Sequence, residues 1–183
     1  MPLKALFAAR PERWDAYKDP LAVAFDAAGL NVDLRLDHAP EEVDYIIYAP
    51  NSALQDFGPF TRAKLVQNLW AGVDSITGNS TLKIPLARMV DFGLRQGMVE
   101  WVTGHTLRHH LGMDAHIHNP DHLWQPAVPP LSRDRRVSVL GLGALGLACA
   151  EALAALGFDV AGWSRRPKTH DKITCFSGED GLT

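Results

Sequence analysis

The stretch that decides the fold is Val137-Ser138-Val139-Leu140-Gly141-Leu142-Gly143-Ala144-Leu145-Gly146. Its first four residues have the apolar, β-branched pattern of a buried strand, and Leu147 to Leu156 has the pattern of a helix. Gly157 ends that helix, and Phe158 to Trp163 reads as a second strand. The order strand, glycine turn, helix, strand predicts a parallel β-α-β unit.

Each glycine of the turn has a physical role. Gly141 permits the tight turn, Gly143 lets the backbone approach a pyrophosphate, and Gly146 lets helix and strand pack closely. The helix N-terminus adds unpaired N–H groups and the positive end of its dipole. A lone Gly-x-Gly-x-x-Gly is weak evidence, but the flanking elements strengthen it. We therefore predict a Rossmann dinucleotide site, with a merely tight turn as the alternative; its cofactor-binding residues are Gly141, Leu142, Gly143, Ala144, Leu145 and Gly146.

The residues after the second strand bear on which dinucleotide binds. A site for NAD usually has Asp or Glu here, which accepts a hydrogen bond from the ribose 2′-hydroxyl. This chain instead has Trp163-Ser164-Arg165-Arg166-Pro167-Lys168. Ser164 can donate to a 2′-phosphate, and guanidinium groups can fork onto its oxygens. The segment favours NADP over NAD and adds Trp163, Ser164, Arg165 and Arg166 to the predicted site; a solvated basic turn is the alternative.

The first half of the chain alternates strand and helix patterns, as parallel α/β sheets do. Asp19-Pro20 offers an N-cap and a proline at the first helical position, and Gly29 ends that helix. A short helix is expected at 60–65. Strands are expected at 3–8, 32–36, 45–49 and 66–70.

A longer helix at 97–111 is predicted to bridge two domains, and Asn119 to Pro130, with four prolines, reads as a loop or arm. We place one domain at 1–95 and the dinucleotide-binding domain at 96–183.

Composition limits the class of protein. The chain has 183 residues, 46% hydrophobic and 21% charged, which is ordinary for a globular protein. A net charge of −3 gives no basic surplus for nucleic acid or an anionic membrane, so the expected partner is a small molecule. The start lacks a signal-peptide pattern, and nowhere do about 18 apolar residues run together, which predicts a cytoplasmic protein.

Cysteine and histidine do not indicate a metal centre. Cys149 and Cys175 have neither a disulfide-framework nor a finger spacing, so we expect reduced thiols. His105 and His109 lie four apart on the predicted helix, but no Glu or Cys accompanies them as in known zinc motifs. We predict no metal site and interpret the histidines as surface or domain-interface residues.

Several stretches together resemble the glyoxylate/hydroxypyruvate reductase A branch of the D-isomer-specific 2-hydroxyacid dehydrogenases. They occur in the family's order: 69–76 (LWAGVDSI), 86–91 (LARMVD), 98–101 (MVEW), 124–126 (WQP), Gly141 to Gly146 and 163–165 (WSR). The resemblance implies a flavodoxin-like substrate domain followed by the first part of a Rossmann domain. It also implies NADPH-dependent reduction of glyoxylate or hydroxypyruvate to the D-2-hydroxy acid, in a homodimer paired through the long helix and the Trp124 arm.

The resemblance also implies a substrate site. Backbone amides of Ala71, Gly72 and Val73 would bind the carboxylate, and Arg88 could approach the cleft or be a surface cation. Independently, a glycine turn opening a short helix at Asp74 presents unpaired N–H groups, although without the resemblance this reads as an ordinary turn.

The family's catalytic arginine, glutamate and histidine would lie beyond Thr183, so no catalytic residue is predicted in this chain. The run 177–180 (SGED) fits a capping box just before the last residue, and two strands alone would leave apolar sheet faces uncovered. We therefore expect a fragment that is inactive by itself. The alternative is a noncatalytic nucleotide-binding or oligomerising protein.

Overall fold

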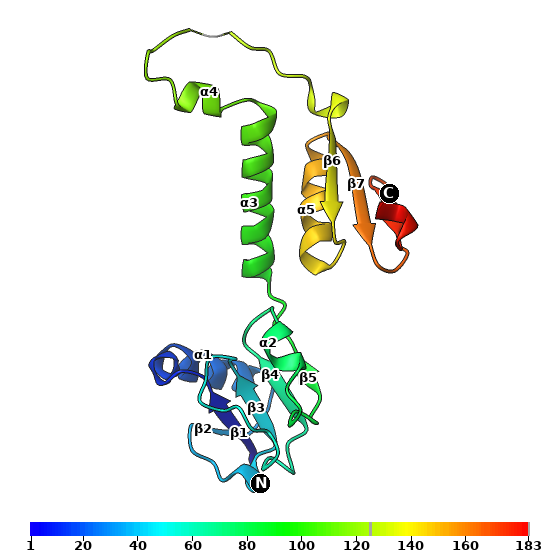
Figure 1. Ribbon diagram of the computed structural model, residues 1–183. Coiled ribbons are helices and arrows are strands. Elements are labelled where there is room, and N and C mark those ends of the chain that lie inside the picture. Colours follow the sequence, from blue (N-terminus) through cyan, green and yellow to red (C-terminus); the bar gives the residue numbers. More distant parts are fainter. Residues whose placement is uncertain (125, 183) are drawn as a thin grey trace. The chain divides into compact units, whose positions relative to one another are not determined.

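The computed structural model describes residues 1–124 and 126–182, which form two compact units (Figure 1). The first unit is Met1–Met89, and the second begins at Val90. Each unit contains its own parallel sheet. None of the helices in the described ranges is long and apolar enough to cross a membrane.

The sheet of the first unit has the strand order β2-β1-β3-β4-β5, and every neighbouring pair is parallel. This is the flavodoxin-like order 2-1-3-4-5, so the predicted fold of this unit is confirmed. The strands are β1 (Leu3–Ala8), β2 (Val32–Arg35), β3 (Tyr45–Tyr48), β4 (Leu65–Asn68) and β5 (Leu86–Ala87). Strand β5 was not predicted, because two residues are too few to show a pattern.

Helix α1 (Trp14–Ala27) begins earlier than predicted, and Pro20 lies inside it rather than at its start. A single-turn helix η1 (Pro11–Arg13) leads into it, with Pro11 at the first position. The rings of Trp14 and Tyr17 pack against Phe7 of β1, at centroid distances of 5.5 and 5.6 Å. This packing fixes the first turns of the helix on the sheet and outweighs the hydrogen bond lost at the proline. The helix ends before Gly29, as predicted.

The short helix predicted at 60–65 is wrong, because this segment is a turn that leads into β4. The carboxylate of Asp44 accepts a hydrogen bond from Arg62 Nε at 3.0 Å, and Lys64 N donates to the Asp44 carbonyl at 2.8 Å. These contacts hold the chain extended where a helix would need to coil. The remaining elements of this unit are η2 (Pro40–Glu42) and α2 (Asp74–Thr77).

The second unit contains a three-stranded parallel sheet in the order β6-β7-β8. The predicted β-α-β unit is confirmed as β6 (Arg136–Leu140), α5 (Ala144–Ala155) and β7 (Asp159–Ser164). Strand β8 (Thr174–Ser177) was not predicted, and after it the expected helix is only the single turn η4 (Asp180–Leu182). Ser177 thus ends a strand, since its backbone pairs with Ser164 of β7.

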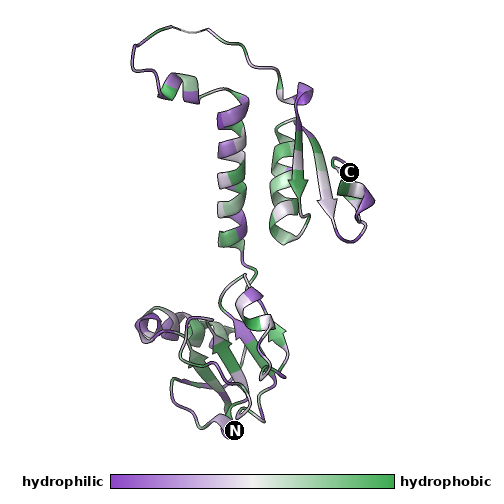
Figure 2. Cartoon of the chain, viewed as in Figure 1, coloured by the Kyte–Doolittle hydropathy of each residue, from purple (hydrophilic) through white to green (hydrophobic). Residues whose placement is uncertain are grey.

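Helix α3 (Phe92–His110) packs against α5, which in turn covers one face of the sheet (Figure 1). It begins five residues earlier than the sequence pattern indicated, because the Asp91 side chain caps it by accepting a hydrogen bond from Leu94 N at 2.9 Å. Figure 2 shows that α5 is mostly apolar, whereas α3 mixes apolar and polar residues. Leu153 of α5 is fully buried, and Val102 and Leu107 of α3 pack against the same core.

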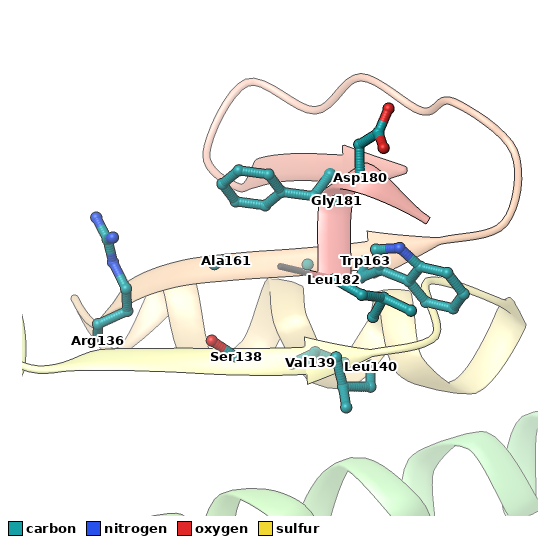
Figure 3. A pocket seen from close by; sticks show the side chains of 11 residues that line it. Arg136, Ser138, Val139, Leu140, Ala161, Trp163, Asp180, Gly181 and Leu182 are labelled. Carbon is teal, nitrogen blue, oxygen red and sulfur yellow. The ribbon is translucent and has the colours of Figure 1, made fainter. Parts of the chain in front are cut away.

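The other face of this sheet is partly open in the described residues. Leu140 is 75% exposed and Phe176 is 44% exposed. A hollow of about 340 Å³ lies on this face between the sheet and the final turn (Figure 3). Trp163 lines the hollow, and its ring nitrogen donates to the Gly178 carbonyl at 2.8 Å.

The segment between α3 and β6 contains α4 (Asp114–Ile117) and η3 (Ser132–Asp134). The described residues of Asn119 to Pro130 form neither helix nor strand, which confirms the predicted loop. Trp124 is 88% exposed in it, and Gln125 of the same motif lies outside the described residues.

Candidate functional site

The glycine turn between β6 and α5 has the geometry that its sequence predicted. Gly141 has φ +110°, a conformation that L side chains rarely adopt, and its N–H donates to Trp163 O at 2.8 Å. A Cβ on Gly146 would lie 1.9 Å from Gly141 O, so only glycine lets α5 approach β6 this closely. Both positions require glycine for the backbone itself.

Gly143 differs from these two because its surroundings are open. It is exposed, occupies the N-cap position of α5, and an added Cβ would meet no atom within 4 Å. The N–H groups of Ala144, Leu145 and Gly146 have no hydrogen-bond acceptor in the described part of the chain. Free space beside unpaired donors at the start of a three-turn helix is suited to a phosphate group.

The segment after β7 lies beside this turn. Ser164 is buried, and its hydroxyl donates to Arg166 O at 2.7 Å. In this conformation it shapes the segment and does not offer its proton to a ligand. Arg165 and Arg166 are exposed, and neither guanidinium forms an ion pair within residues 1–124 and 126–182.

Lys168 makes a contact that was not predicted from the sequence. Its ammonium donates to the carbonyl of Leu142 and so ties the basic segment to the glycine turn. Its place in the run of basic residues after Ser164 was the available signal. The structure thus brings the predicted cofactor-binding residues together at the carboxyl ends of β6 and β7, where parallel sheets bind ligands.

In the first unit, Ala71, Gly72 and Val73 form a turn after β4 that we name the amide turn. Their three N–H groups have no acceptor in the described residues. Asn68, at the end of β4, is completely buried, and its Nδ2 donates to Gly72 O at 2.9 Å. Sequence reasoning missed this residue, since a single asparagine at a strand end gives no pattern.

Arg88 follows β5, the strand next to β4, and is exposed. Met89 N donates to Trp70 O at 3.2 Å, which ties the segment of Arg88 to the start of the amide turn. The predicted carboxylate-binding residues therefore lie at neighbouring strand ends of one sheet. Arg88 forms no ion pair with any described residue.

Two histidines of the long helix pack against aromatic rings. His105 lies 4.2 Å from the Trp101 ring, and the buried His110 lies 4.9 Å from Phe158 in an edge-on arrangement. Among the residues that the structure describes, no three His, Cys, Asp or Glu side chains are grouped so that they could hold a metal ion. The cysteines are both free, with Cys149 buried in α5.

Comparison of the sequence with known proteins finds relatives, although no protein-family model matches the chain. Glyoxylate/hydroxypyruvate reductase A of Yersinia enterocolitica is 37% identical over 122 residues, which are 62% of this chain and 39% of that protein. The protein of the same name from Citrobacter koseri is 32% identical over 174 residues, 88% of this chain and 53% of that protein. The chain thus spans about half the length of these relatives or less.

Solved structures agree with the sequence comparison. A D-isomer-specific 2-hydroxyacid dehydrogenase from Xanthobacter autotrophicus, crystallised with NADPH, matches 100% of this chain with a TM-score of 0.86 and 33% identity. An NADPH-dependent glyoxylate/hydroxypyruvate reductase from Sinorhizobium meliloti, crystallised with NADP and sulfate, matches 99% with a TM-score of 0.72 and 32% identity. The chain covers 59% and 57% of those two proteins.

Proposed function

We propose that this chain supplies the substrate-binding and cofactor-binding residues of an NADPH-dependent 2-keto acid reductase. The basis is its similarity to D-isomer-specific 2-hydroxyacid dehydrogenases of the glyoxylate/hydroxypyruvate reductase A type. In that proposal the first unit binds the substrate and the second binds part of the cofactor. The substrate is glyoxylate or hydroxypyruvate. Hydroxypyruvate gives the D-2-hydroxy acid, and glyoxylate gives glycolate, which has no stereocentre. The observation that carries the proposal is the glycine turn with unpaired amides beside two unpaired arginines.

The residues present fit NADP. The open space at Gly143 would admit the pyrophosphate, and the α5 amides would donate to its oxygens. Arg165 and Arg166 would bind the 2′-phosphate. The ammonium of Lys168, which donates to Leu142 O in this structure, could instead donate to the same phosphate. When bound, the nicotinamide supplies the hydride.

The amide turn would hold the substrate. Three unpaired N–H groups can donate to a carboxylate, and Arg88 at the neighbouring strand end adds a positive charge. A carboxylate fixed at one end of a 2-keto acid orients the keto carbon for reduction. The role of this chain's own residues is therefore to bind and orient.

Hydride addition to a keto group creates an alkoxide, which needs a proton donor and a polarising cation. No residue of this chain matches the family's histidine, glutamate or arginine for these roles. We therefore expect that the 183-residue chain binds NADPH but does not oxidise it with glyoxylate or hydroxypyruvate. NADPH absorbance at 340 nm checks this; turnover at rates typical of enzymes would contradict it.

The test of the proposed function is binding and turnover measured in parallel. The 183-residue chain should bind NADPH more tightly than NADH in a fluorescence titration, and a longer protein that contains this chain should reduce glyoxylate or hydroxypyruvate with NADPH. A longer protein that binds NADPH but reduces neither acid would support a noncatalytic role instead. A chain that binds neither dinucleotide would contradict the cofactor site.

A noncatalytic oligomerising function is the second candidate, and exposed aromatic residues favour it. Trp101 on α3 is 64% exposed and Trp124 is 88% exposed, which is unusual for tryptophan. The same residues would serve pairing in a complete homodimeric enzyme. Light scattering at micromolar concentration separates the cases, since a strictly monomeric mass for the longer protein would exclude both uses of these side chains.

A further inference from the structure

The buried amide of Asn68 is a feature of the first unit that packing does not explain. Asn68 is completely buried on the face of β4 that also carries Val66, a member of the apolar core. Its Nδ2 donates to Gly72 O at 2.9 Å, but its Oδ1 has no hydrogen-bond partner among the residues that the structure describes. A buried polar atom without a partner is unfavourable, so an apolar residue of similar size would suit the core better.

The hydrogen bond from the Asn68 side chain to Gly72 O fixes the direction of a peptide group. In a trans peptide the C=O and the following N–H point in opposite directions. Gly72 O points into the unit, toward the buried Asn68 amide, so the N–H of Val73 points the other way. Gly72 is exposed, which places this peptide at the surface of the sheet end. Without the Asn68 donor, the peptide could rotate and present its carbonyl oxygen outward.

We propose that Asn68 is a positioning residue that aims the Val73 N–H of the amide turn at the carboxylate of the substrate. An outward carbonyl would repel an anion, whereas an outward N–H donates to it. The short helix α2 is only four residues long, so its dipole adds little and the peptide direction decides the binding. This inference rests on the proposed carboxylate site at the amide turn.

The experiment is an amide-resolved NMR titration of the 183-residue chain with oxamate, a stable anion whose carboxylate adjoins a carbonyl group. In the wild-type chain the N–H signals of Ala71, Gly72 and Val73 should shift and saturate. If they do not respond, the proposed substrate site is wrong. That outcome is distinguishable from a failure of the inference about Asn68, which is tested by variants of a chain that does respond.

Two nearly isosteric variants test the inference. Asn68→Leu removes the donor and should weaken oxamate binding about ten- to a hundredfold at every pH. Asn68→Asp introduces a carboxyl that can donate to Gly72 O only when protonated, so its oxamate affinity should fall as pH rises from 5 to 9. The wild-type titration at each pH corrects for other titrating groups. Wild-type affinity in Asn68→Leu, with a flat profile in Asn68→Asp, would overturn the proposal.

A measurement on the unmodified chain keeps the test open if the variants fold poorly. The Asn68 side-chain amide hydrogens should exchange slowly with solvent, and bound oxamate should slow them further because it holds the Gly72–Val73 peptide. The exposed side chains of Asn31 and Asn51 are the internal controls. Exchange at Asn68 as fast as at these two, or unaffected by saturating oxamate, would contradict the positioning role.

Discussion

The two units turn the chain after a parallel strand in different ways. After β6 the turn is fixed by glycines, with φ +110° at Gly141 and a backbone approach at Gly146 that leaves no room for a Cβ. After β4 the turn is fixed by a side chain, the buried Asn68 amide on Gly72 O. Gly72 itself has no positive φ, and a Cβ there would meet nothing. The turn after β6 therefore depends on the absence of side chains at its glycines, and the turn after β4 depends on one side-chain hydrogen-bond donor.

The difference determines which variants should damage which unit. A glycine-fixed turn fails when a side chain is added, because the backbone has nowhere to move. A turn fixed by a side chain fails when a polar partner is removed. The largest effect is therefore expected in the glycine turn.

Gly146→Ala should destabilise the second unit by about 3 kcal/mol or more, since its Cβ would overlap the Gly141 carbonyl oxygen and force α5 away from β6. Urea unfolding followed by the amide NMR signals of α5 and β6, which report the second unit alone, measures this. Gly143→Ala is the matched control, because its Cβ meets open space; its stability should change by about 1 kcal/mol or less while NADPH binding is lost. Equal stability of the two variants would contradict the assigned roles.

The same difference between glycine-fixed and side-chain-fixed turns explains which features could be predicted from the sequence. The glycine turn and its strand-helix-strand frame were predictable because Gly141 and Gly146 leave a pattern in the sequence. In the first unit the alternating elements predicted a parallel α/β sheet, but its flavodoxin-like strand order was expected only from the family resemblance. The early start of α1 was not predictable, because ring packing on Phe7 outweighs Pro20. Asn68 was not predictable either, since its role depends on a contact that only the folded turn creates.

The next effect concerns cofactor choice in the second unit. Arg165→Ala and Arg166→Ala should each weaken NADPH binding by about tenfold to a hundredfold while changing NADH binding little, because only NADPH carries the 2′-phosphate. Fluorescence titration with both cofactors measures the ratio. Lys172→Ala, an exposed charge of the same loop, is the control for a general loss of positive charge. Equal losses for both cofactors would mean that the arginines support the fold or the shared pyrophosphate.

The first unit should respond to loss of a buried carboxylate. Asp44 is 1% exposed, and its carboxylate accepts from Lys4 N and Arg62 Nε, both at 3.0 Å. Asp44→Ala leaves the Lys4 N–H without its acceptor and should cost about 1–3 kcal/mol in unfolding free energy. Glu42→Ala, which removes only an exposed partner of Lys4, should cost less. Equal costs would show that burial of Asp44 contributes nothing.

The same carboxylate gives the first unit an acid dependence. The hydrogen bond from the Lys4 backbone, with help from Arg62, lowers the pKa of Asp44 below its ordinary value. A lowered folded-state pKa means that the stabilisation is complete above the ordinary pKa near about 4 and is lost as pH falls toward the folded-state pKa. The stability difference between wild type and Asp44→Asn should therefore shrink as pH falls below about 4. A difference that stays constant would contradict the lowered pKa.

The smallest effect concerns where α3 begins, the position at which the sequence pattern and the folded chain disagree. The apolar spacing predicts a start near Gly97, whereas the structure starts the helix at Phe92 because Asp91 accepts from Leu94 N. Asp91→Ala should cost about 1 kcal/mol and speed amide exchange in the first turn, at Leu94 and Arg95. Asp121→Ala, an exposed carboxylate in the loop, should change neither quantity. Fast exchange at these two amides already in the wild-type chain would place the start of the helix near Gly97, as the spacing predicts. The hydrogen bond from Leu94 N to Asp91 would then contribute nothing to the stability of the helix.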